Sequence, residues 1–394
     1  MKKTFFFILA AAIFFGCKKA DTPQHYIAAV IWPSCHNDSL TLADLWSEGK
    51  GEWEMIQKGD PRFEGHYQPK RPYWGYELDD DPKVVEKWID TATAHGVNTF
   101  VFDWYWYKDF PYLEGCLNDG FLGASNNEKM WFYIMYANHD VQKALWNYHR
   151  YGPDNEELLY DAAITEEQFK KLVDRWITRY FTRPNYLKVD GKPIFWIYDI
   201  SVLLRSFGTV EKTAEMLAYL KDECVKAGFS GLYLQGREVS WQKKTVEELL
   251  GREINFYELY KDLGFTAMGN YCMSGDRNED YQIYCETSLK DQAETAARLA
   301  EQGITFIPTA SVGWDNTPRY PQFGMDRTVH INRTPENFKT MLQKIEPLIT
   351  ETPNILLLNA WNEWIEDAYL LPDEVYGFGY LEAVRDVYGP SCRQ

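Results

Sequence analysis

The chain alternates between short, continuously apolar runs and longer segments in which apolar residues recur at helical spacing. Runs that are apolar throughout, rather than at every second position, are typical of parallel strands buried on both faces. The helical segments between them predict the crossover connections of a parallel sheet. The eight predicted strands are Tyr26–Trp32, Thr99–Trp104, Trp131–Ala137, Ile194–Tyr198, Leu232–Gln235, Thr266–Gly269, Ile304–Thr309 and Ile355–Asn359.

Helix boundaries between these runs carry recognisable signals. Pro82 follows Asp81, and Pro335 follows Thr334, so each proline is expected at the first helical position behind a capping side chain. Gly96 lies where a glycine typically ends a helix. The predicted helices are Pro82–His95, Glu166–Tyr180, Val210–Ala227, Thr245–Leu250, Leu289–Gln302 and Pro335–Ile349.

Eight strands with helical crossovers predict an α/β fold, a (β/α)8 TIM barrel with loop insertions beyond the usual length of about 250 residues. No linker rich in Pro, Gly or Ser, no charge block and no low-complexity run divides the chain, so we expect a single catalytic domain over residues 26–394. A doubly wound sheet is the alternative. It is not favoured, because no Gly-x-Gly-x-x-Gly or P-loop motif marks a nucleotide crevice.

The first residues have the pattern of a targeting segment. A basic pair precedes the apolar run Phe5–Phe15, which ends at Gly16 and Cys17. The run is too short to span a membrane as a helix, and a Cys directly after a small residue resembles a bacterial lipobox. We therefore expect a lipoprotein signal peptide over residues 1–16 and a short tether over 17–25. The expected product is an exported bacterial lipoprotein in the periplasm or outer membrane, held to the membrane by a lipid anchor on Cys17.

The composition of the chain narrows the kinds of ligand that it could bind. The 41 Lys and Arg against 58 Asp and Glu give a net charge of −17, which argues against nucleic acid as a ligand. Aromatic residues make up 16% of the chain, which suits the flat, weakly polar faces of sugars as well as a large core. The cysteines after Cys17 form no Cys-x-x-Cys pair, so we expect mostly buried thiols and neither a metal nor another cofactor. No feature of the sequence identifies a protein partner.

Candidate chemistry comes from the strand ends, because the active sites of such barrels lie at the carboxyl ends of the strands. Carboxylates, amides and aromatic side chains gather there, a combination that suits a sugar site without metal ligands. Since alternate side chains on a strand point to opposite sides, some of the aromatic residues should face the helices instead. The candidates from these ends are Asp103, Trp104, Trp106, Asn138, Tyr271, Trp314, Asp315, Trp361, Asn362 and Trp364.

Two acids after the last predicted strand are the most informative residues. Glu363 and Glu366 are three positions apart, and Asp367 is adjacent. If the segment turns helically, positions i and i+3 share a face with Cβ atoms about 5–6 Å apart. Ionising one carboxyl then disfavours ionising the other. Glycoside hydrolysis needs one protonated acid and one carboxylate, and a separation near 5 Å favours retention of configuration. The alternative is that both glutamates are solvated charges on a surface turn.

Several segments together resemble the WbsX-like family, which is related to glycoside hydrolase family 99, the endo-α-1,2-mannosidase type. The resemblance extends from about residue 26 to 385. It is carried by SEGKGEWEMI (47–56), GHYQPKRPYWGYEL (65–78), FDWYWY (102–107), VDGKPIFWIY (189–198), GWDNTPRY (313–320) and NAWNEWIEDAYLLPD (359–373). His66 and Arg319 lie in these segments and join the candidate sugar contacts. Arg319 could pair with Asp315 in the site, or the pair could brace a loop.

The resemblance implies a (β/α)8 barrel with a retaining glycosidase site and no cofactor. The family 99 pattern Asn-Glu-Trp-x-Glu places Glu366 as the acid/base that protonates the leaving oxygen. It places Glu363 as the base that polarises the 2-hydroxyl of the substrate, which itself attacks the anomeric carbon. Ile365 stands where the mannosidases carry His, and Asp367 where they carry Gly. The resemblance therefore extends to the acid pair and not to mannoside specificity.

Three functions remain open at this point. The first is an exported glycoside hydrolase that cleaves a polysaccharide or glycan. The second is a glycosyltransferase of polysaccharide synthesis, the activity after which WbsX-like proteins were first named; the export signal argues against it, because nucleotide-sugar donors are cytoplasmic. The third is a carbohydrate-binding lipoprotein with an inactive site, against which the presence of both glutamates argues.

Overall fold

The computed structural model describes residues 25–152, 155–238, 242–274, 279–320 and 329–390. The predicted signal peptide, the lipidated Cys17 and all but the last residue of the predicted tether lie outside the described residues. Within the described part of the chain, no helix is both long and apolar enough to cross a membrane.

All eight predicted runs form strands, and they pair with one another in parallel. The sheet runs in the order β11-β10-β9-β8-β4-β2-β1-β13-β12. Its strands are β1 (Tyr26–Ile31), β2 (Thr99–Tyr107), β4 (Trp131–Tyr136), β8 (Lys192–Ile197), β9 (Tyr233–Arg237), β10 (Ala267–Gly269), β11 (Thr305–Ile307), β12 (Thr309–Ser311) and β13 (Ile355–Asn359).

The seventh predicted strand is split, and the split closes the ring. Pro308 separates β11 from β12, because proline has no N–H for a strand ladder. β11 pairs with β10 on one side, whereas β12 pairs with β13 on the other. The carbonyl of Pro308 still accepts a hydrogen bond from the Leu357 N–H at 2.9 Å. The predicted (β/α)8 barrel in a single domain is therefore confirmed.

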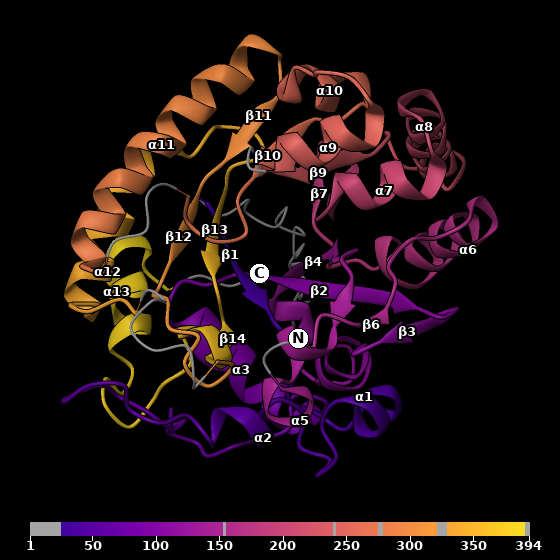
Figure 1. Ribbon diagram of the computed structural model, residues 1–394. Coiled ribbons are helices and arrows are strands. Elements are labelled where there is room, and N and C mark those ends of the chain that lie inside the picture. The colour runs from indigo at the N-terminus through magenta and orange to yellow at the C-terminus, as the bar shows by residue number, and fades with distance from the viewer. Residues whose placement is uncertain (1–24, 153–154, 239–241, 275–278, 321–328, 391–394) are drawn as a thin grey trace, which may run out of the picture.

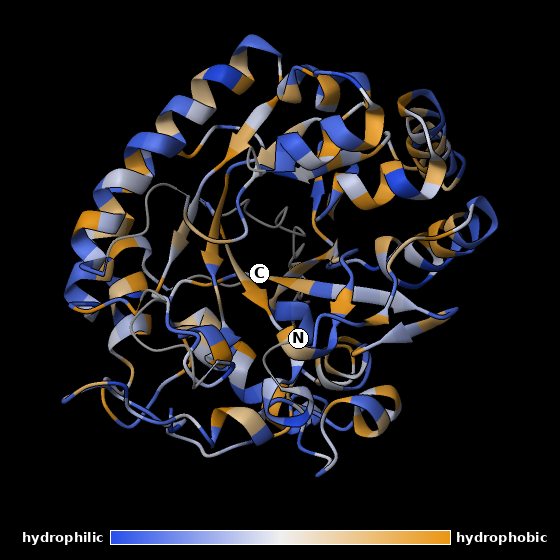
Figure 2. Ribbon diagram, in the orientation of Figure 1, coloured by the Kyte–Doolittle hydropathy of each residue, from blue (hydrophilic) through white to orange (hydrophobic). Residues whose placement is uncertain are grey.

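Helices surround the strands in Figure 1, and Figure 2 shows that the strands are predominantly apolar whereas the helices are mixed. Each predicted helix is present. Helix α11 starts earlier than expected, and a π-helix over Ile177–Phe181 replaces the last turn of the helix predicted for Glu166–Tyr180. The helices α7, α10 and α13 were not predicted. The main helices are α3 (Pro82–Ala94), α6 (Glu166–Trp176), α7 (Ile200–Phe207), α8 (Val210–Lys226), α9 (Lys243–Leu250), α10 (Phe256–Asp262), α11 (Tyr281–Glu301), α12 (Pro335–Ile345) and α13 (Gly379–Tyr388).

The predicted helix signals are confirmed. The Asp81 side chain accepts a hydrogen bond from the Lys83 N–H, and Thr334 caps α12 in the same way. Gly96 follows α3 with φ of +92°, a left-handed conformation that favours glycine.

Insertions extend two connections of the barrel. Between β1 and β2 lie two short helices, and between β4 and β8 lies a small two-stranded sheet with two more. Both insertions contribute side chains to the cavity described below. Their elements, with the two short strands beside β2 and β8, are α1 (Ser39–Asp44), α2 (Trp53–Ile56), β3 (Phe110–Tyr112), β5 (Val141–Gln142), α4 (Lys143–Trp146), α5 (Tyr148–Tyr151), β6 (Leu158–Tyr160) and β7 (Lys188–Val189).

Much of the aromatic content packs between the barrel and its helices. Trp176 of α6 packs against Phe195 of β8 with ring centroids 4.5 Å apart. Phe121 packs against Phe132 of β4 with ring centroids 5.1 Å apart. Of the five cysteines that the structure describes, four are buried and Cys272 is half-buried.

Candidate active site

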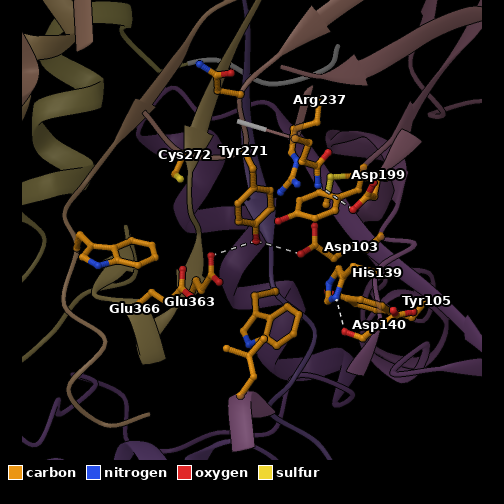
Figure 3. Close-up of a pocket in the computed structure, with 18 of the residues that line it drawn as sticks. Asp103, Tyr105, His139, Asp140, Asp199, Arg237, Tyr271, Cys272, Glu363 and Glu366 are labelled. Atoms are coloured by element: carbon orange, nitrogen blue, oxygen red, sulfur yellow. Dashed lines mark hydrogen bonds between the residues drawn. The ribbon is translucent and has the colours of Figure 1, made fainter. Parts of the chain in front are cut away.

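A cavity of about 720 Å³ opens where the strands end. Carboxylates, two arginines and aromatic rings line it, and Figure 3 shows many of them converging on one space. Among the lining residues are Trp32, Glu52, Asp103, Tyr105, His139, Trp146, Tyr198, Asp199, Arg237, Glu238, Gln242, Asn270, Tyr271, Cys272, Trp314, Arg319, Glu363 and Glu366.

The two glutamates come from a short hairpin that follows β13. Glu363 ends β14 (Asn362–Glu363), which pairs with β15 (Ala368–Tyr369), and a single 3-10 turn over Trp364–Glu366 joins them. The segment is therefore not the α-helical turn considered from the spacing. The tight turn nevertheless brings both carboxyls to the same cavity rather than to bulk water.

Asn362 fixes this hairpin to the first strand. Its side-chain oxygen accepts a hydrogen bond from the Trp32 N–H at 2.9 Å, and its amide donates to the Trp32 carbonyl at 2.7 Å. The side chain thus replaces a rung of backbone pairing between the ends of β1 and β13. Since Glu363 is the next residue, this anchor fixes where its backbone lies.

Glu363 is buried among neutral and acidic groups. Its Oε2 accepts hydrogen bonds from Tyr271 at 3.0 Å and from Asn359 at 3.3 Å. Burial, followed by the nearby charges of Glu366 and Asp103, raises the pKa of Glu363 well above its usual range.

Glu366 has a different environment. The Arg319 guanidinium donates to its Oε1 at 2.6 Å and lies 3.7 Å from Glu52 on its other side. Burial alone would lower the pKa of Arg319, but the charges of Glu366 and Glu52 outweigh it and raise the pKa. Arg319 is therefore a fixed cation between Glu366 and Glu52.

Glu52 lies in the turn before α2, and its N–H donates to the Ser34 carbonyl, which places it beside the end of β1. Its Oε2 accepts hydrogen bonds from Trp32 at 2.6 Å and Ser34 at 2.9 Å. The preceding Gly51 has φ of +61°, and a Cβ there would lie 2.0 Å from the Ser34 carbonyl oxygen. Only glycine fits so close an approach, which explains the glycine before Glu52.

The far side of the cavity is built from different strands. The Arg237 guanidinium lies 3.5 Å from the centre of the Tyr198 ring, a cation–π contact. His139 lies between Tyr198 and Trp146, and burial lowers the pKa of His139 to about 4, so its ring is neutral near pH 7. Asp199 accepts a hydrogen bond from Gln242 at 2.9 Å.

Six of the predicted site residues line this cavity, and the others do not. The six are Asp103, Tyr271, Trp314, Arg319, Glu363 and Glu366. Arg319 pairs with Glu366 and not, as considered, with Asp315. The predicted residues away from the cavity wall are Trp104, Trp106, His66, Asn138, Asp315, Trp361, Asn362 and Trp364.

The tryptophans among them pack elsewhere. Trp104 faces the helices, where its Nε1 donates to Glu114 at 2.8 Å, and Trp106 stacks beside it at 6.1 Å. Trp361 packs against Phe100 at 5.2 Å. Trp364 stacks on Tyr369 at 3.8 Å. On β2, Asp103 and Tyr105 face the cavity, so the residues between and after them face away.

Asn138 and Asp315 tie loops together instead. Asn138 exchanges two hydrogen bonds with the backbone of Asp199, at 2.7 and 2.8 Å. Asp315 is fully buried and accepts from Gln68 at 2.6 Å, with His66 at 2.8 Å. Lys70 lies 3.7 Å away. Burial alone would raise the pKa of Asp315, but these partners hold it well below its usual range.

Sequence reasoning did not assign Glu52, Trp146, Gln242 or Glu238 to the site. Glu52, Trp146 and Gln242 lie in connections rather than at strand ends, whereas Glu238 directly follows β9. For Glu52, its place in the segment SEGKGEWEMI was the available signal. Within the described residues, no group of three or more His, Cys, Asp or Glu side chains is arranged to hold a metal ion.

Comparison with known families assigns the chain. A family model described as "Glycosyltransferase WbsX" matches residues 32–384, most of the chain. The chain belongs to the WbsX family. The "Uncharacterized protein WxcX" of two strains of Xanthomonas campestris pv. campestris is 24% identical over 354 residues, which are 86% of this chain and 46% of the relative. This WbsX-family chain therefore spans about half the length of the curated relatives it matches.

Solved structures share its fold. A "Glycoside hydrolase-like protein" superposes with a TM-score of 0.60 at 13% identity, covering 97% of this chain and 98% of the other. The GH99 endo-α-mannosidase from Bacteroides thetaiotaomicron, in complex with BIS-TRIS-propane, superposes with a TM-score of 0.57 at 12% identity, covering 93% and 97%. These similarities show that the chain shares the barrel fold of the family 99 enzyme.

Proposed function

We propose that this WbsX-family protein is an exported glycoside hydrolase that cleaves glycosidic bonds in a polysaccharide or glycan. One observation carries the proposal: Glu363 and Glu366 line one cavity from a single turn, in contrasting environments. Glu363 is buried against Tyr271, whereas Glu366 is paired with Arg319. Division of two carboxyls between protonated and ionised forms is the requirement of glycoside hydrolysis.

The proposed roles follow the resemblance. Glu366 gives a proton to the leaving glycosidic oxygen and later takes one from water. Glu363 accepts a hydrogen bond from the substrate 2-hydroxyl as that oxygen attacks the anomeric carbon, with retention of configuration. In the ligand-free protein burial favours the protonated form of Glu363, the residue that this mechanism needs as a base. Glu366 therefore has to leave its ion pair with Arg319, and Glu363 has to lose or share its proton, when substrate binds.

The test is hydrolysis of plant, host and microbial glycans, with product analysis by mass spectrometry and proton NMR. Glu366→Gln and Glu363→Gln should each lower turnover of the cleaved glycan by about 10²–10⁴-fold. Glu374→Gln, an exposed glutamate after the hairpin, is the matched control and should retain full activity. Unchanged turnover in both site variants would refute the proposed chemistry.

The two glutamates can be told apart by the leaving group. An activated aryl glycoside needs little protonation, so Glu366→Gln should lose much less activity on it than on the glycan. Glu363→Gln should lose a comparable share of activity on the aryl glycoside and on the glycan. The opposite ranking would assign the acid role to Glu363.

The family name supports a second candidate, a glycosyltransferase. Incubation with nucleotide sugars and an acceptor glycan tests it directly. Transfer from a nucleotide sugar without hydrolysis of any glycan would replace the hydrolase proposal, and binding of a glycan without any product would favour a non-catalytic role.

A further inference from the structure

One hydroxyl lies between two buried carboxyls at the centre of the cavity. The Tyr271 hydroxyl is 3.0 Å from Asp103 Oδ2 and 3.0 Å from Glu363 Oε2. The three side chains come from different strand ends, after β10, on β2 and after β13, and Figure 3 shows them converging. Both carboxyls are nearly inaccessible, with Asp103 5% exposed and Glu363 4% exposed.

The number of protons in this cluster is limited. A tyrosine hydroxyl has one proton to donate, so it cannot satisfy two carboxylates at once. With both acids ionised, one of the two contacts would place a lone pair against a buried negative charge. A single additional proton removes the conflict, because the protonated acid donates to the tyrosine oxygen and the tyrosine donates to the other carboxylate.

No cation among the described residues is in contact with either acid. The charge of Arg319 lowers the pKa of Glu363 from a distance but does not outweigh burial and the nearby acids. Among the described residues, Asp103 and Glu363 form no ion pair. Arg319 binds Glu366 and Glu52 instead.

The other titratable groups facing the cluster do not compensate either. They are Glu366, Glu52, Tyr105 and Tyr198, each acidic or neutral. Burial, together with the charge of Glu366, raises the pKa of Asp103 well above its usual range despite the hydrogen bond from Tyr271. The pKa of Glu363 is raised for similar reasons.

We propose that Asp103 is a positioning residue that shares one proton with Glu363 through the Tyr271 hydroxyl. The exchange is balanced: the Asp103 proton passes to the tyrosine oxygen while the tyrosine proton passes to Glu363, and the reverse shift restores the first state. The three groups together keep a charge of −1 throughout. The inference rests on the proposed hydrolase function.

This sharing resolves the proton distribution noted for the ligand-free site. With the proton on Asp103, Glu363 is a carboxylate and can accept the proton of the substrate 2-hydroxyl. Glu363 then becomes a base without releasing a proton to water. Asp103 never has to touch the reacting atoms.

The first experiment needs no substrate. Infrared spectroscopy of the whole protein at pH 7 should show the C=O stretching band of a buried carboxylic acid. Asp103→Asn and Glu363→Gln should each remove the band, because either change ends the sharing. Tyr198→Phe, a tyrosine in the same cavity outside the cluster, should keep it. Absence of the band in the wild type, or its survival in both acid variants, would overturn the inference.

The second experiment uses the pH profile of kcat/KM on a cleaved glycan. The two acids lie at most about 6 Å apart, so replacing Asp103 with Asn should move the acidic limb down by about 1–3 pH units. Tyr271→Phe removes a donor to Glu363 and should move that limb up. If Asp103 and Tyr271 only supported the fold, the two substitutions would lower kcat/KM but would not displace the acidic limb in opposite directions.

The two experiments separate this inference from the proposed function. If the infrared band behaves as expected and no glycan is hydrolysed, the hydrolase proposal fails and the shared proton stands. If glycans are hydrolysed but the limb is unmoved in both variants, the shared proton fails and the hydrolase stands.

Discussion

Arg319 offers the most demanding test of how the site is held together. It is the cation between Glu366, at 2.6 Å, and Glu52, at 3.7 Å. Methionine at position 319 retains a long, flexible side chain and removes the charge. Two carboxylates that faced a common cation then face each other across an apolar side chain.

The expected cost follows from burial. Removing one partner of a buried ion pair costs about 3–5 kcal/mol, because the remaining charge is left uncompensated. Glu52 is 2% exposed and keeps its hydrogen bonds from Trp32 and Ser34, while Glu366 reaches solvent to a small extent. We therefore expect the lower end, about 3 kcal/mol of unfolding free energy at pH 8.

The cost should depend on pH. Burial already raises the pKa of Glu52 in the folded protein, and loss of Arg319 raises it further. A carboxyl with a raised folded-state pKa destabilises the protein as the pH rises through that pKa, and protonation relieves it. The loss caused by Arg319→Met should therefore be smaller at pH 5 than at pH 8.

The assay is equilibrium urea unfolding of the wild type, Arg319→Met, Glu52→Gln and the double variant, followed by tryptophan fluorescence at both pH values. Glu52→Gln should cost less in the Arg319→Met background than in the wild type, with a coupling of about 0.5–3 kcal/mol. A loss below about 1 kcal/mol at pH 8, or additivity of the two changes within about 0.5 kcal/mol, would refute the reasoning.

Three further predictions concern other parts of the chain. Asp315→Asn should destabilise the protein by about 3 kcal/mol at pH 7, since it removes the buried carboxylate that His66, Gln68 and Lys70 share and leaves Lys70 with Asp367 alone, and the loss should shrink below about pH 4, where the carboxyl of the unfolded wild-type chain becomes protonated; urea unfolding at both pH values checks this. Trp314→Ala should raise KM for the cleaved glycan by up to about tenfold with little change in kcat, as steady-state kinetics would show. Cys17→Ser should move the full-length chain from the membrane to the soluble fraction of its cells, and a variant that stays in the membrane pellet would argue against the lipid anchor.

The barrel could be predicted from sequence because its strands are buried on both faces. Runs such as Leu356–Leu358 have no polar face to confuse with a surface helix. The split at Pro308 and helix α13 were not foreseen: the first depends on which neighbour each half pairs with, and the second follows a hairpin whose path only the fold defines.

The sequence predicted only part of the site, because position at a strand end was the main available signal. Strand ends identified Asp103 and Tyr271, but the aromatic residues Trp104 and Tyr105 are equally suited to either side of β2, and no local pattern states which one faces inward. Glu52 reaches the cavity from a connection, where it contacts Trp32 and Arg319, residues distant from it in the sequence.

The anchor between Asn362 and Trp32 has a consequence for biogenesis. The hairpin that bears both glutamates follows the last strand and is fastened to the first, so the two ends of the barrel must meet before the acids can face Tyr271 and Arg319. A nascent or partly unfolded chain therefore has no assembled chemistry, however many of its inner strands are in place. Enzymatic turnover would accordingly report that the whole ring has formed.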